Sequence, residues 1–365
     1  MNYIFKDKTI LVTGCCGTVG NELIYQLLND NKYKPKEVIG LDNNETGIFY
    51  LDQKYINFRK ARFIFGDVRK QNELIQKFHG VDIVFHTAAL KHVILSERSP
   101  DEVVDTNILG VQNIIIAANV NKIEKVIFTS SDKAVNPTNV MGTSKLMGER
   151  LISAANSGKR EIRPIFASTR FGNVLGSSGS VVPIFYNQIK EGGPVTLTNK
   201  FMSRFIMNIK EAVSLVINSA IKAKGGEVFI TKMPVIRIED LAKSMIEVLA
   251  PKFGFAPKKI KIIEIGEQPG EKLYEELMSD EESRRALELK DFFIILPAFR
   301  GIYQNIKYTY KDVVNLKIKK AYSSQNEKPL NFNDIKKFLI KNDLVETPEK
   351  FMLNRYWIGD KRQKF

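Results

Sequence analysis

A short apolar segment that runs straight into a glycine-rich loop is the feature that most restricts how this chain can fold. Residues 9–13 (TILVT) are apolar and β-branched, which predicts a strand, and residues 14–20 read GCCGTVG. Residues 21–28 (NELIYQLL) then carry apolar side chains at helical spacing. A strand, a tight turn and a helix in this order are typical of a parallel sheet with helices packed against it.

Further strands are predicted by short apolar runs that alternate with helix-like segments. These runs lie at residues 38–42, 62–67, 81–86 and 126–130. The alternation predicts an α/β fold, a Rossmann-type doubly wound parallel sheet with helices on both faces. Beyond about residue 172, glycine-rich loops break the rhythm. Because one core stops growing at roughly 250–300 residues, we also expect a smaller C-terminal lobe.

Composition and charge exclude several classes of protein. With 44% hydrophobic residues the chain is too apolar for a disordered or fibrous protein. Its two cysteines, Cys15 and Cys16, are neighbours, so we expect neither a disulfide nor a metal site. The net charge is 55 − 41 = +14, but the lysines are scattered along the sequence. Scattered charge favours a solvated surface as the first explanation and a polyanionic small substrate as the second, with a nucleic-acid partner third. Without a run of about 18 apolar residues or a signal peptide, we expect a cytoplasmic protein with no membrane insertion.

The spacing of Gly14, Gly17 and Gly20 predicts a dinucleotide-binding loop. The first glycine permits the tight turn, the second lets backbone N–H groups approach a pyrophosphate, and the third allows close helix packing. Asp42 ends the next strand, where a carboxylate accepts hydrogen bonds from both hydroxyls of an adenosine ribose. No arginine follows it to bind a 2′-phosphate, so we expect NAD rather than NADP. Asp67 ends the third strand, where it either meets the adenine edge or caps a helix.

The loop after the fifth predicted strand carries the candidate acid–base residues. Ligands of open α/β sheets bind outside the carboxyl ends of the strands, so Ser131, Asp132 and Lys133 are expected to face that crevice. Met141 and Lys145 are spaced i, i+4 and share one face of the helix that follows. Taken singly, such residues are more often a helix cap, a solvated lysine and core packing. Their combination favours catalysis.

Several motifs together resemble the extended short-chain dehydrogenase/reductase superfamily: the glycine pattern, Asp42, HTAA at residues 86–89, Asn107, and the block from Ser131 to Lys145. Within it the chain is similar to the nucleotide-sugar 4,6-dehydratases of bacterial polysaccharide biosynthesis, most of all the UDP-N-acetylglucosamine 4,6-dehydratases. The segments that carry this similarity are AALKHV (88–93), SDKA (131–134), RFGNV (170–174), SRF (203–205) and PGEKLYEEL (269–277). The resemblance runs from about Lys8 to about Asp312.

Two positions depart from the family pattern. Most of the superfamily has tyrosine where this chain has Met141, and a thioether has no proton to exchange. A subgroup of the 4,6-dehydratases is similar in carrying methionine there, which favours that subgroup over a tyrosine-dependent epimerase. The family often has arginine where this chain has Gln268, so one phosphate or base contact of the family is missing from the sequence.

The resemblance implies a lyase that removes water across carbons 5 and 6 of a nucleotide-linked N-acetylhexosamine and gives a 4-keto-6-deoxy sugar. Hydride passes from carbon 4 to NAD and returns to carbon 6. Lys133, kept neutral by desolvation and Lys145, is expected to take the carbon 5 proton. Asp132, helped by Ser131, is expected to take the carbon 4 hydroxyl proton and to protonate the departing carbon 6 hydroxyl.

Site residues follow from the motifs and the resemblance together. The expected catalytic residues are Ser131, Asp132, Lys133, Met141 and Lys145. The expected cofactor-binding residues are Gly14, Gly17, Thr18, Val19, Gly20, Asp42, Asn43, Asp67, Val68, Ala88, Ala89, Lys91, Asn107, Ser130 and Lys145. The expected substrate-binding residues are Lys91, Ser131, Asn173, Ser180, Val181, Arg204 and Glu271.

Three parts of the chain are expected to act as units. We expect an NAD-binding Rossmann domain over residues 1–172, mostly a substrate-binding lobe with some return to the sheet over 173–320, and a C-terminal tail over 321–365. In the tail, Asn333 is expected to cap a helix from Asp334 to about Leu344. The resemblance also implies a homo-oligomer, with the helix after Pro100 and the helix that holds Met141 as interface candidates.

Other functions stay open at this point. The nearest is a nucleotide-sugar epimerase, including a dehydratase that also inverts carbon 5. A rival of another class is a non-catalytic dinucleotide sensor on the same fold, because a fold does not determine a function. Neither the nucleotide, UDP or GDP, nor the outcome at carbon 5 can be read from the sequence.

Overall fold

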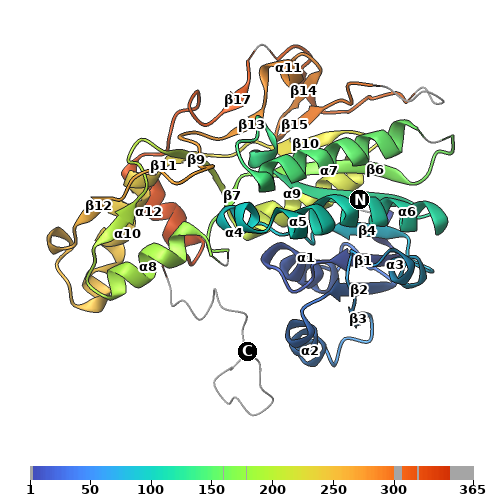
Figure 1. Ribbon diagram of the computed structural model, residues 1–365, viewed down its shortest axis with the longest axis horizontal. Coiled ribbons are helices and arrows are strands. Elements are labelled where there is room, and N and C mark those ends of the chain that lie inside the picture. The colour runs from blue at the N-terminus through green and yellow to red at the C-terminus, as the bar shows by residue number, and fades with distance from the viewer. Residues whose placement is uncertain (1–2, 159, 178, 300–305, 319, 346–365) are drawn as a thin grey trace.

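One large sheet organises the computed structural model, which describes residues 3–345 except 159, 178, 300–305 and 319 (Figure 1). Its strand order is β16-β14-β15-β10-β6-β5-β4-β1-β2-β3. The parallel strands are β1 (Thr9–Thr13), β2 (Glu37–Asp42), β3 (Ala61–Phe65), β4 (Ile83–His86), β5 (Lys125–Ser131), β6 (Ile165–Phe171) and β10 (Val228–Thr231). Three antiparallel strands extend one edge: β15 (Phe292–Ile295), β14 (Ala286–Leu289) and β16 (Val313–Asn315). The predicted doubly wound α/β fold is confirmed.

Helices cover both faces of this sheet. One face carries α1 (Thr18–Asn29) and α9 (Ile209–Lys222), and the other carries α3 (Gln71–Lys77), α6 (Gly110–Val120) and α7 (Val140–Ser157). The remaining helices of this part are η1 (Tyr3–Phe5), α2 (Glu45–Lys54), α4 (Val93–Arg98), α5 (Pro100–Val103), η2 (Val104–Leu109) and η3 (Asp132–Ala134).

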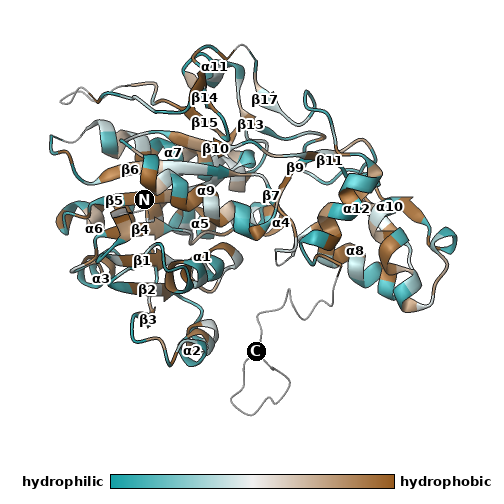
Figure 2. Cartoon of the chain, turned by 180° about the vertical axis from the view of Figure 1, so that it is seen from behind, coloured by the Kyte–Doolittle hydropathy of each residue, from teal (hydrophilic) through white to brown (hydrophobic). Residues whose placement is uncertain are grey.

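The side chains of β1 show why its sequence is apolar at every position. Ile10 and Val12 pack into the core under α1 and α9, whereas Leu11 packs into the core under α3 and α6. A strand buried on both faces reads as a continuous apolar run rather than as an alternating one. Figure 2 shows the same pattern, with hydrophobic colour on the central strands and mixed colour along the helices that cover them.

A smaller lobe has its own core beside the main sheet. Its helices are α8 (Val181–Lys190), α10 (Ile238–Leu249) and α12 (Phe332–Lys341), with the short turns η4 (Pro251–Phe253) and η5 (Pro257–Lys259). Small sheets pair β11 (Val235–Arg237), β9 (Ser203–Met207) and β7 (Asn173–Val174), and β12 (Ile262–Glu264) with β8 (Val195–Leu197). A further pair joins β13 (Glu276–Met278) to β17 (Tyr322–Ser323), and α11 (Asp280–Ser283) follows β13. Since β10, β14 and β15 return to the main sheet, a domain division at residue 172 remains a proposal.

The C-terminal segment differs from the expectation in its helix. Asn331, not Asn333, is the N-cap of α12, because its side chain accepts the Asp334 N–H at 3.0 Å and starts the helix two residues earlier. The helix ends at Lys341 rather than near Leu344. Residues 346–365 of the expected tail lie outside the described residues.

The continuous helix Pro100–Val120 is long and apolar enough to cross a membrane, by length and composition alone, and no other helix of the described residues is. Such a helix was not expected from the sequence. Its Asn113 side chain donates to the Val68 carbonyl at 3.0 Å, and 44% of its most apolar stretch is buried inside the protein. The Asn113 bond thus ties this helix to the segment that follows β3.

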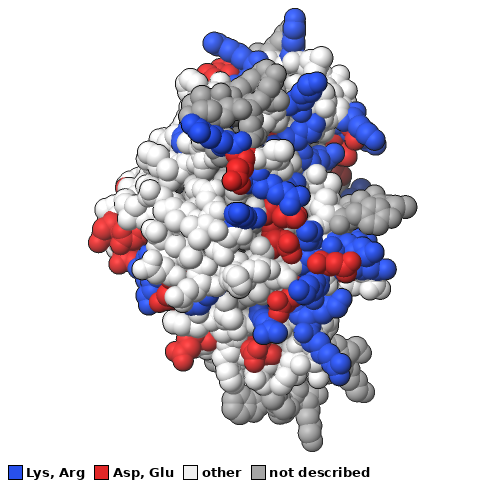
Figure 3. Space-filling model, turned by 90° about the vertical axis from the view of Figure 1, so that its right-hand side faces the viewer, with Lys and Arg blue, Asp and Glu red and all other residues white. Residues whose placement is uncertain are grey.

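Charge on the surface is mixed in sign. Figure 3 shows Lys and Arg interspersed with Asp and Glu on the face that it displays, without a stripe of a single sign. Such a distribution is the one expected for solvated surface charge.

Candidate active site at the carboxyl edge of the sheet

The glycine loop is folded tightly between β1 and α1. Gly14 has φ +69°, and a Cβ built there would lie 2.6 Å from the Ala88 backbone nitrogen. A Cβ at Gly20 would lie 2.3 Å from the Gly14 carbonyl oxygen. Both positions therefore require glycine, and the loop is brought directly against the residues that follow β4. This backbone cradle fits the dinucleotide predicted from the sequence.

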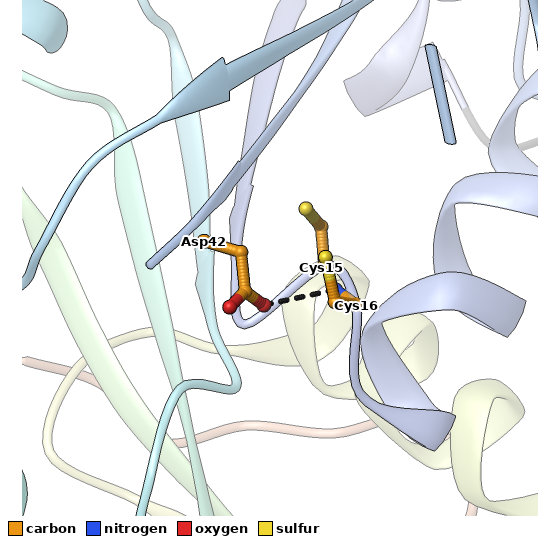
Figure 4. Close-up of side chains that lie close together, drawn as sticks. All are labelled: Cys15, Cys16 and Asp42. Atoms are coloured by element: carbon orange, nitrogen blue, oxygen red, sulfur yellow. Dashed lines mark hydrogen bonds between the residues drawn. The ribbon is translucent and has the colours of Figure 1, made fainter. Parts of the chain in front are cut away.

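Asp42 lies at the end of β2 and faces the glycine loop (Figure 4). Its carboxylate accepts the Cys16 N–H at 2.9 Å and the Asn44 N–H at 3.0 Å. The structure thus places the predicted ribose carboxylate beside the predicted pyrophosphate loop. The geometry fits an adenosine bound across the two elements.

Ligand atoms of Cys15, Cys16 and Asp42 lie within 4.8 Å of one another, as Figure 4 shows. Metal binding requires thiolate, yet the hydrogen bond with Cys16 and burial raise the pKa of the Cys15 thiol. Both oxygens of Asp42 already accept backbone N–H groups. The three groups are therefore accounted for by the packing of the loop.

Asp67, which was predicted to meet the adenine edge, forms an ion pair with Arg69. The guanidinium Nη2 lies 2.7 Å from Asp67 Oδ2, and the Arg69 backbone N–H donates to Oδ1 at 2.9 Å. The helix N-cap expected as one alternative for Asp67 is wrong, because α3 begins at Gln71 after Lys70. Val68 is buried, and Asn43 lies beside Asp67.

Asn107 connects the loop after β4 to α7. It sits in η2, a π-helical turn, where its side chain exchanges hydrogen bonds of 2.9 Å with both backbone groups of Leu90. The same amide donates to Ser144 Oγ at 2.9 Å. The structure therefore gives Asn107 a positioning role for the loop that carries Ala88, Ala89 and Lys91, while its direct contact with a cofactor stays a prediction.

Asp132 and Lys133 form a close pair directly after β5. Asp132 is 1% exposed, and its Oδ1 accepts hydrogen bonds from Ser131 Oγ at 2.6 Å, Lys133 N at 2.9 Å and Lys133 Nζ at 3.1 Å. Its Oδ2 is buried with no hydrogen-bond partner in the described part of the chain. The Lys133 side chain remains 23% exposed. An acid–base pair is thus held at the edge where ligands of this fold bind.

A second carboxylate, that of Glu275, lies beside Asp132 and Lys133 and was not predicted from the sequence. Glu275, 3% exposed, has Oε1 at 3.5 Å from Lys133 Nζ and 3.7 Å from Arg204 Nε. The residue lies within the PGEKLYEEL segment, from which only Glu271 was selected. Glu275 lies in the loop just before β13, so no strand alternation marks it as the inward-facing glutamate. Here Glu276 instead accepts a hydrogen bond from Asn136.

The expectation that desolvation and Lys145 keep Lys133 neutral stays a prediction, and the carboxylates around Lys133 oppose it. Burial disfavours the charged amine, but Asp132 and Glu275 outweigh it and raise the pKa of Lys133. Lys145, expected to assist, donates instead to the Thr129 carbonyl at 2.9 Å and lies over the Phe128 ring. Burial lowers the pKa of Lys145 to about 8.

The first turn of α7 packs directly on the Asp132–Lys133 turn. A Cβ at Gly142 would lie 2.3 Å from the Lys133 carbonyl oxygen, so glycine is required there. Asn139 caps the helix by accepting the Gly142 N–H at 2.8 Å. Met141, 4% exposed, is thereby brought to the acid–base pair.

Residues expected to bind substrate come from six separate segments. Ser180 and Val181 begin α8 next to Gly179, where a Cβ would lie 2.8 Å from the His92 ring, so this helix meets the loop that carries Lys91. Asn173 donates to the Phe205 carbonyl at 3.2 Å.

Arg204 and Glu271 differ in exposure. The Arg204 side chain is 12% exposed and donates to the Ser203 and Leu273 carbonyls in addition to its contact with Glu275. Glu271 is exposed. Ser130 is buried, with an Oγ that has no partner among the described residues. The predicted contacts of these residues with ligands remain proposals.

Comparison with known proteins places the chain in a family. A family model described as polysaccharide biosynthesis protein matches residues 10–297. The chain belongs to this family. It is 49% identical over 335 residues to an uncharacterized membrane protein of Methanocaldococcus jannaschii, covering 92% of this chain and 96% of that one. It is 38% identical over 351 residues to a UDP-glucose 4-epimerase of Rickettsia bellii, covering 94% and 98% of the two chains.

Solved structures show the same fold. Pen from Bacillus thuringiensis matches with a TM-score of 0.85 and 40% identity, over 94% of this chain and all of that one. DesIV, a dTDP-glucose 4,6-dehydratase from Streptomyces venezuelae with NAD and TYD bound, matches with a TM-score of 0.64 and 21% identity, over 73% and 86% of the chains. At that identity DesIV is evidence for the fold alone.

Proposed function

We propose that this protein is an NAD-dependent nucleotide-sugar 4,6-dehydratase that acts on UDP-N-acetylglucosamine or a related nucleotide-linked N-acetylhexosamine. The observation that carries the proposal is the buried Asp132 next to the partly exposed Lys133 at the end of β5. Removing water across carbons 5 and 6 needs a base at one carbon and an acid at the other. Epimerisation at carbon 4 needs only one group that exchanges a single hydroxyl proton.

The roles of the two residues follow from their chemistry. Asp132 takes the proton of the carbon 4 hydroxyl and later gives a proton to the departing carbon 6 hydroxyl, with Ser131 bonded to the same carboxylate at 2.6 Å. Lys133, once neutral, takes the carbon 5 proton, which the neighbouring carbon 4 ketone makes acidic. Met141 has no exchangeable proton and shapes the site.

NAD bound along the glycine loop supplies the acceptor that removes hydride from carbon 4 and returns it to carbon 6. The loop and Asp42 hold the pyrophosphate and the adenosine ribose, while Val19 and Thr18 begin the helix whose N-terminus faces the phosphates. The acidic end of β2, without a following arginine, favours NAD over NADP.

A 4-epimerase is the second candidate, and the Rickettsia relative at 38% identity favours it. The two functions are separated by mass. Incubation with UDP-N-acetylglucosamine should give a product lighter by one water, whereas an epimerase gives a product of unchanged mass and a dinucleotide sensor gives none. In deuterated water the dehydration product should carry one deuterium at carbon 5. Unchanged mass in every nucleotide sugar tried, UDP- or GDP-linked, would overturn the proposal.

The protein is further proposed to be a cytoplasmic homo-oligomer. Apolar side chains are exposed on the two helices expected at the interface, with Val104 at 42%, Leu109 at 43% and Met147 at 46%. Exposed apolar groups that gather on neighbouring helices are typical of subunit contacts. Light scattering of the purified protein should give a mass that is a multiple of 41.5 kDa.

A further inference from the structure

Four charged side chains from three separate segments form a chain of alternating sign. Asp132 and Lys133 come from η3, Arg204 from β9, and Glu275 from the loop before β13. Lys133 Nζ lies 3.1 Å from Asp132 Oδ1 and 3.5 Å from Glu275 Oε1, and Arg204 Nε lies 3.7 Å from the same Glu275 oxygen. Lys133 is therefore flanked by two buried carboxylates.

The backbone of Glu275 is fixed by Ser324. The Glu275 N–H donates to Ser324 Oγ at 2.9 Å, and the Ser324 N–H donates to the Glu275 carbonyl at 2.9 Å. Ser324 Oγ also lies 2.9 Å from Ser203 Oγ, next to Arg204. These bonds fix the backbone from which the Glu275 carboxylate reaches Lys133.

The two carboxylates are stabilised very differently. Asp132 Oδ1 accepts three hydrogen bonds, while its Oδ2 is buried with no partner among the described residues. Glu275 has only the two longer ion-pair contacts, and its Oε2 is buried with no partner among the described residues. Burial and the charge of Asp132 raise the pKa of Glu275, and Lys133, Arg204 and Lys272 oppose this only in part. Burial therefore favours the protonated form of the Glu275 carboxyl group.

A base must be neutral to take a proton, yet Asp132 and Glu275 raise the pKa of Lys133 and so favour its charged form. Resting on the proposed function, we propose that Glu275 is a positioning residue that accepts the proton of Lys133 when substrate excludes water from the site. One N–H bond at Lys133 Nζ breaks and one O–H bond forms at a Glu275 carboxyl oxygen, with no change of oxidation state. The resulting amine takes the carbon 5 proton. Loss of water favours this transfer because it penalises both charges at once.

The proposal has a distinct consequence for pH dependence. The charged pair and the neutral pair hold the same number of protons, so wild-type turnover should be flat with pH in the neutral range. In Glu275→Gln the amine forms only by losing a proton to solvent. Turnover of this variant should then rise roughly tenfold per pH unit below the pKa of Lys133. The loss of turnover in Glu275→Gln relative to wild type should be largest at low pH and shrink as pH rises.

The predicted pH dependence is tested by measuring kcat from pH 6 to 9 for wild type, for Glu275→Gln and for two further variants. Glu275→Asp keeps a titrating carboxylate and should keep the flat profile at a lower level. Glu276→Gln removes the adjacent glutamate, which bonds to Asn136 instead, and should match wild type. A purely structural role of Glu275 would lower kcat equally at every pH, so a Glu275→Gln profile parallel to wild type would overturn the proposal.

A second measurement separates this proposal from the proposed function. If wild type does not dehydrate any nucleotide sugar, the proposed function fails, but Lys133 can still be examined in the protein alone. Trace labelling with acetic anhydride at a series of pH values, read by peptide mass spectrometry, reports the midpoint at which the Lys133 amine becomes neutral. Loss of an anion at 3.5 Å should lower that midpoint in Glu275→Gln and not in Glu276→Gln. An unchanged midpoint would contradict the coupling.

Discussion

The glycine loop and the acid–base cluster are built in opposite ways. All parts of the loop lie between Thr13 and Asp42, in one strand–helix–strand unit, and its shape depends on glycines and backbone N–H groups. The acid–base cluster gathers Asp132, Lys133, Arg204 and Glu275 from segments more than 70 residues apart, and it depends on side-chain charge. The first site is therefore local and depends mainly on backbone geometry, whereas the second depends on side-chain charge.

The largest effect is expected in the charge cluster. General acids and bases are each worth roughly 10²–10⁴ in rate, so Asp132→Asn and Lys133→Ala should each lower kcat by about that factor while NAD affinity is kept. With Lys133→Ala, oxidation at carbon 4 remains possible and absorbance of the reduced nicotinamide should build up. With Asp132→Asn no such absorbance should appear. Normal turnover and normal deuterium incorporation at carbon 5 in Lys133→Ala would refute its role.

A second expected effect concerns the scaffold behind the cluster. Arg170, 1% exposed, uses all five guanidinium N–H groups on Glu149 in α7, on Glu282 in α11 and on the Leu277 carbonyl. Removing one partner of such a buried group leaves unpaired charge, so Arg170→Met should destabilise the fold by about 3–5 kcal/mol. Urea unfolding at pH 7 measures this.

Low pH supplies the control for Arg170→Met. Burial favours neutral Glu282, but Arg170 outweighs it and lowers the pKa of Glu282 to about 2. A depressed pKa stabilises the fold above the unfolded carboxyl pKa, and this contribution is lost as pH falls from about 4 toward 2. The difference in free energy of unfolding between wild type and Arg170→Met should shrink over that range. A constant difference would show that packing, not charge, is what Arg170 contributes.

Much of the difference between the two sites could be predicted from the sequence, but not all. The loop and Asp42 were predictable because spacing along one strand–turn–helix unit fixes their geometry. Glu275 was missed because its contact with Lys133 spans more than 140 residues and depends on how the segment before β13 packs on the main core. For the same reason the sequence did not indicate that Glu275 adds to the effect of Asp132 in raising the pKa of Lys133. The π-helical turn that carries Asn107 has no pattern in the sequence that would reveal it.

The glycine loop side should respond to one change of charge, at Asp42. Asp42→Ala removes the hydrogen bonds predicted between the Asp42 carboxylate and the adenosine ribose. Because charge-assisted hydrogen bonds are worth roughly 1.5–3 kcal/mol, NAD binding should weaken by roughly ten- to a hundredfold. The variant also removes the acceptor of the Cys16 N–H, so Asp42→Asn, which keeps a side-chain oxygen there, serves as the matched control. Calorimetric titration of NAD and NADP into each protein gives the comparison. Equal or better activity of the wild type with NADP would contradict the assignment of NAD.

The smallest effect is expected at Met141, whose side chain contributes only its shape to the site. Met141 is 4% exposed at the start of α7, and its thioether has no proton to give or take. A swap of Met for Leu in a packed site typically costs less than about 1.5 kcal/mol, so Met141→Leu should retain a substantial part of kcat with unchanged NAD affinity. Met141→Ala is the matched variant that removes the shape as well, and it should lose more. If Met141→Leu instead falls as far as Asp132→Asn, the sulfur itself takes part in the reaction and the division of roles between Asp132 and Lys133 must be redrawn.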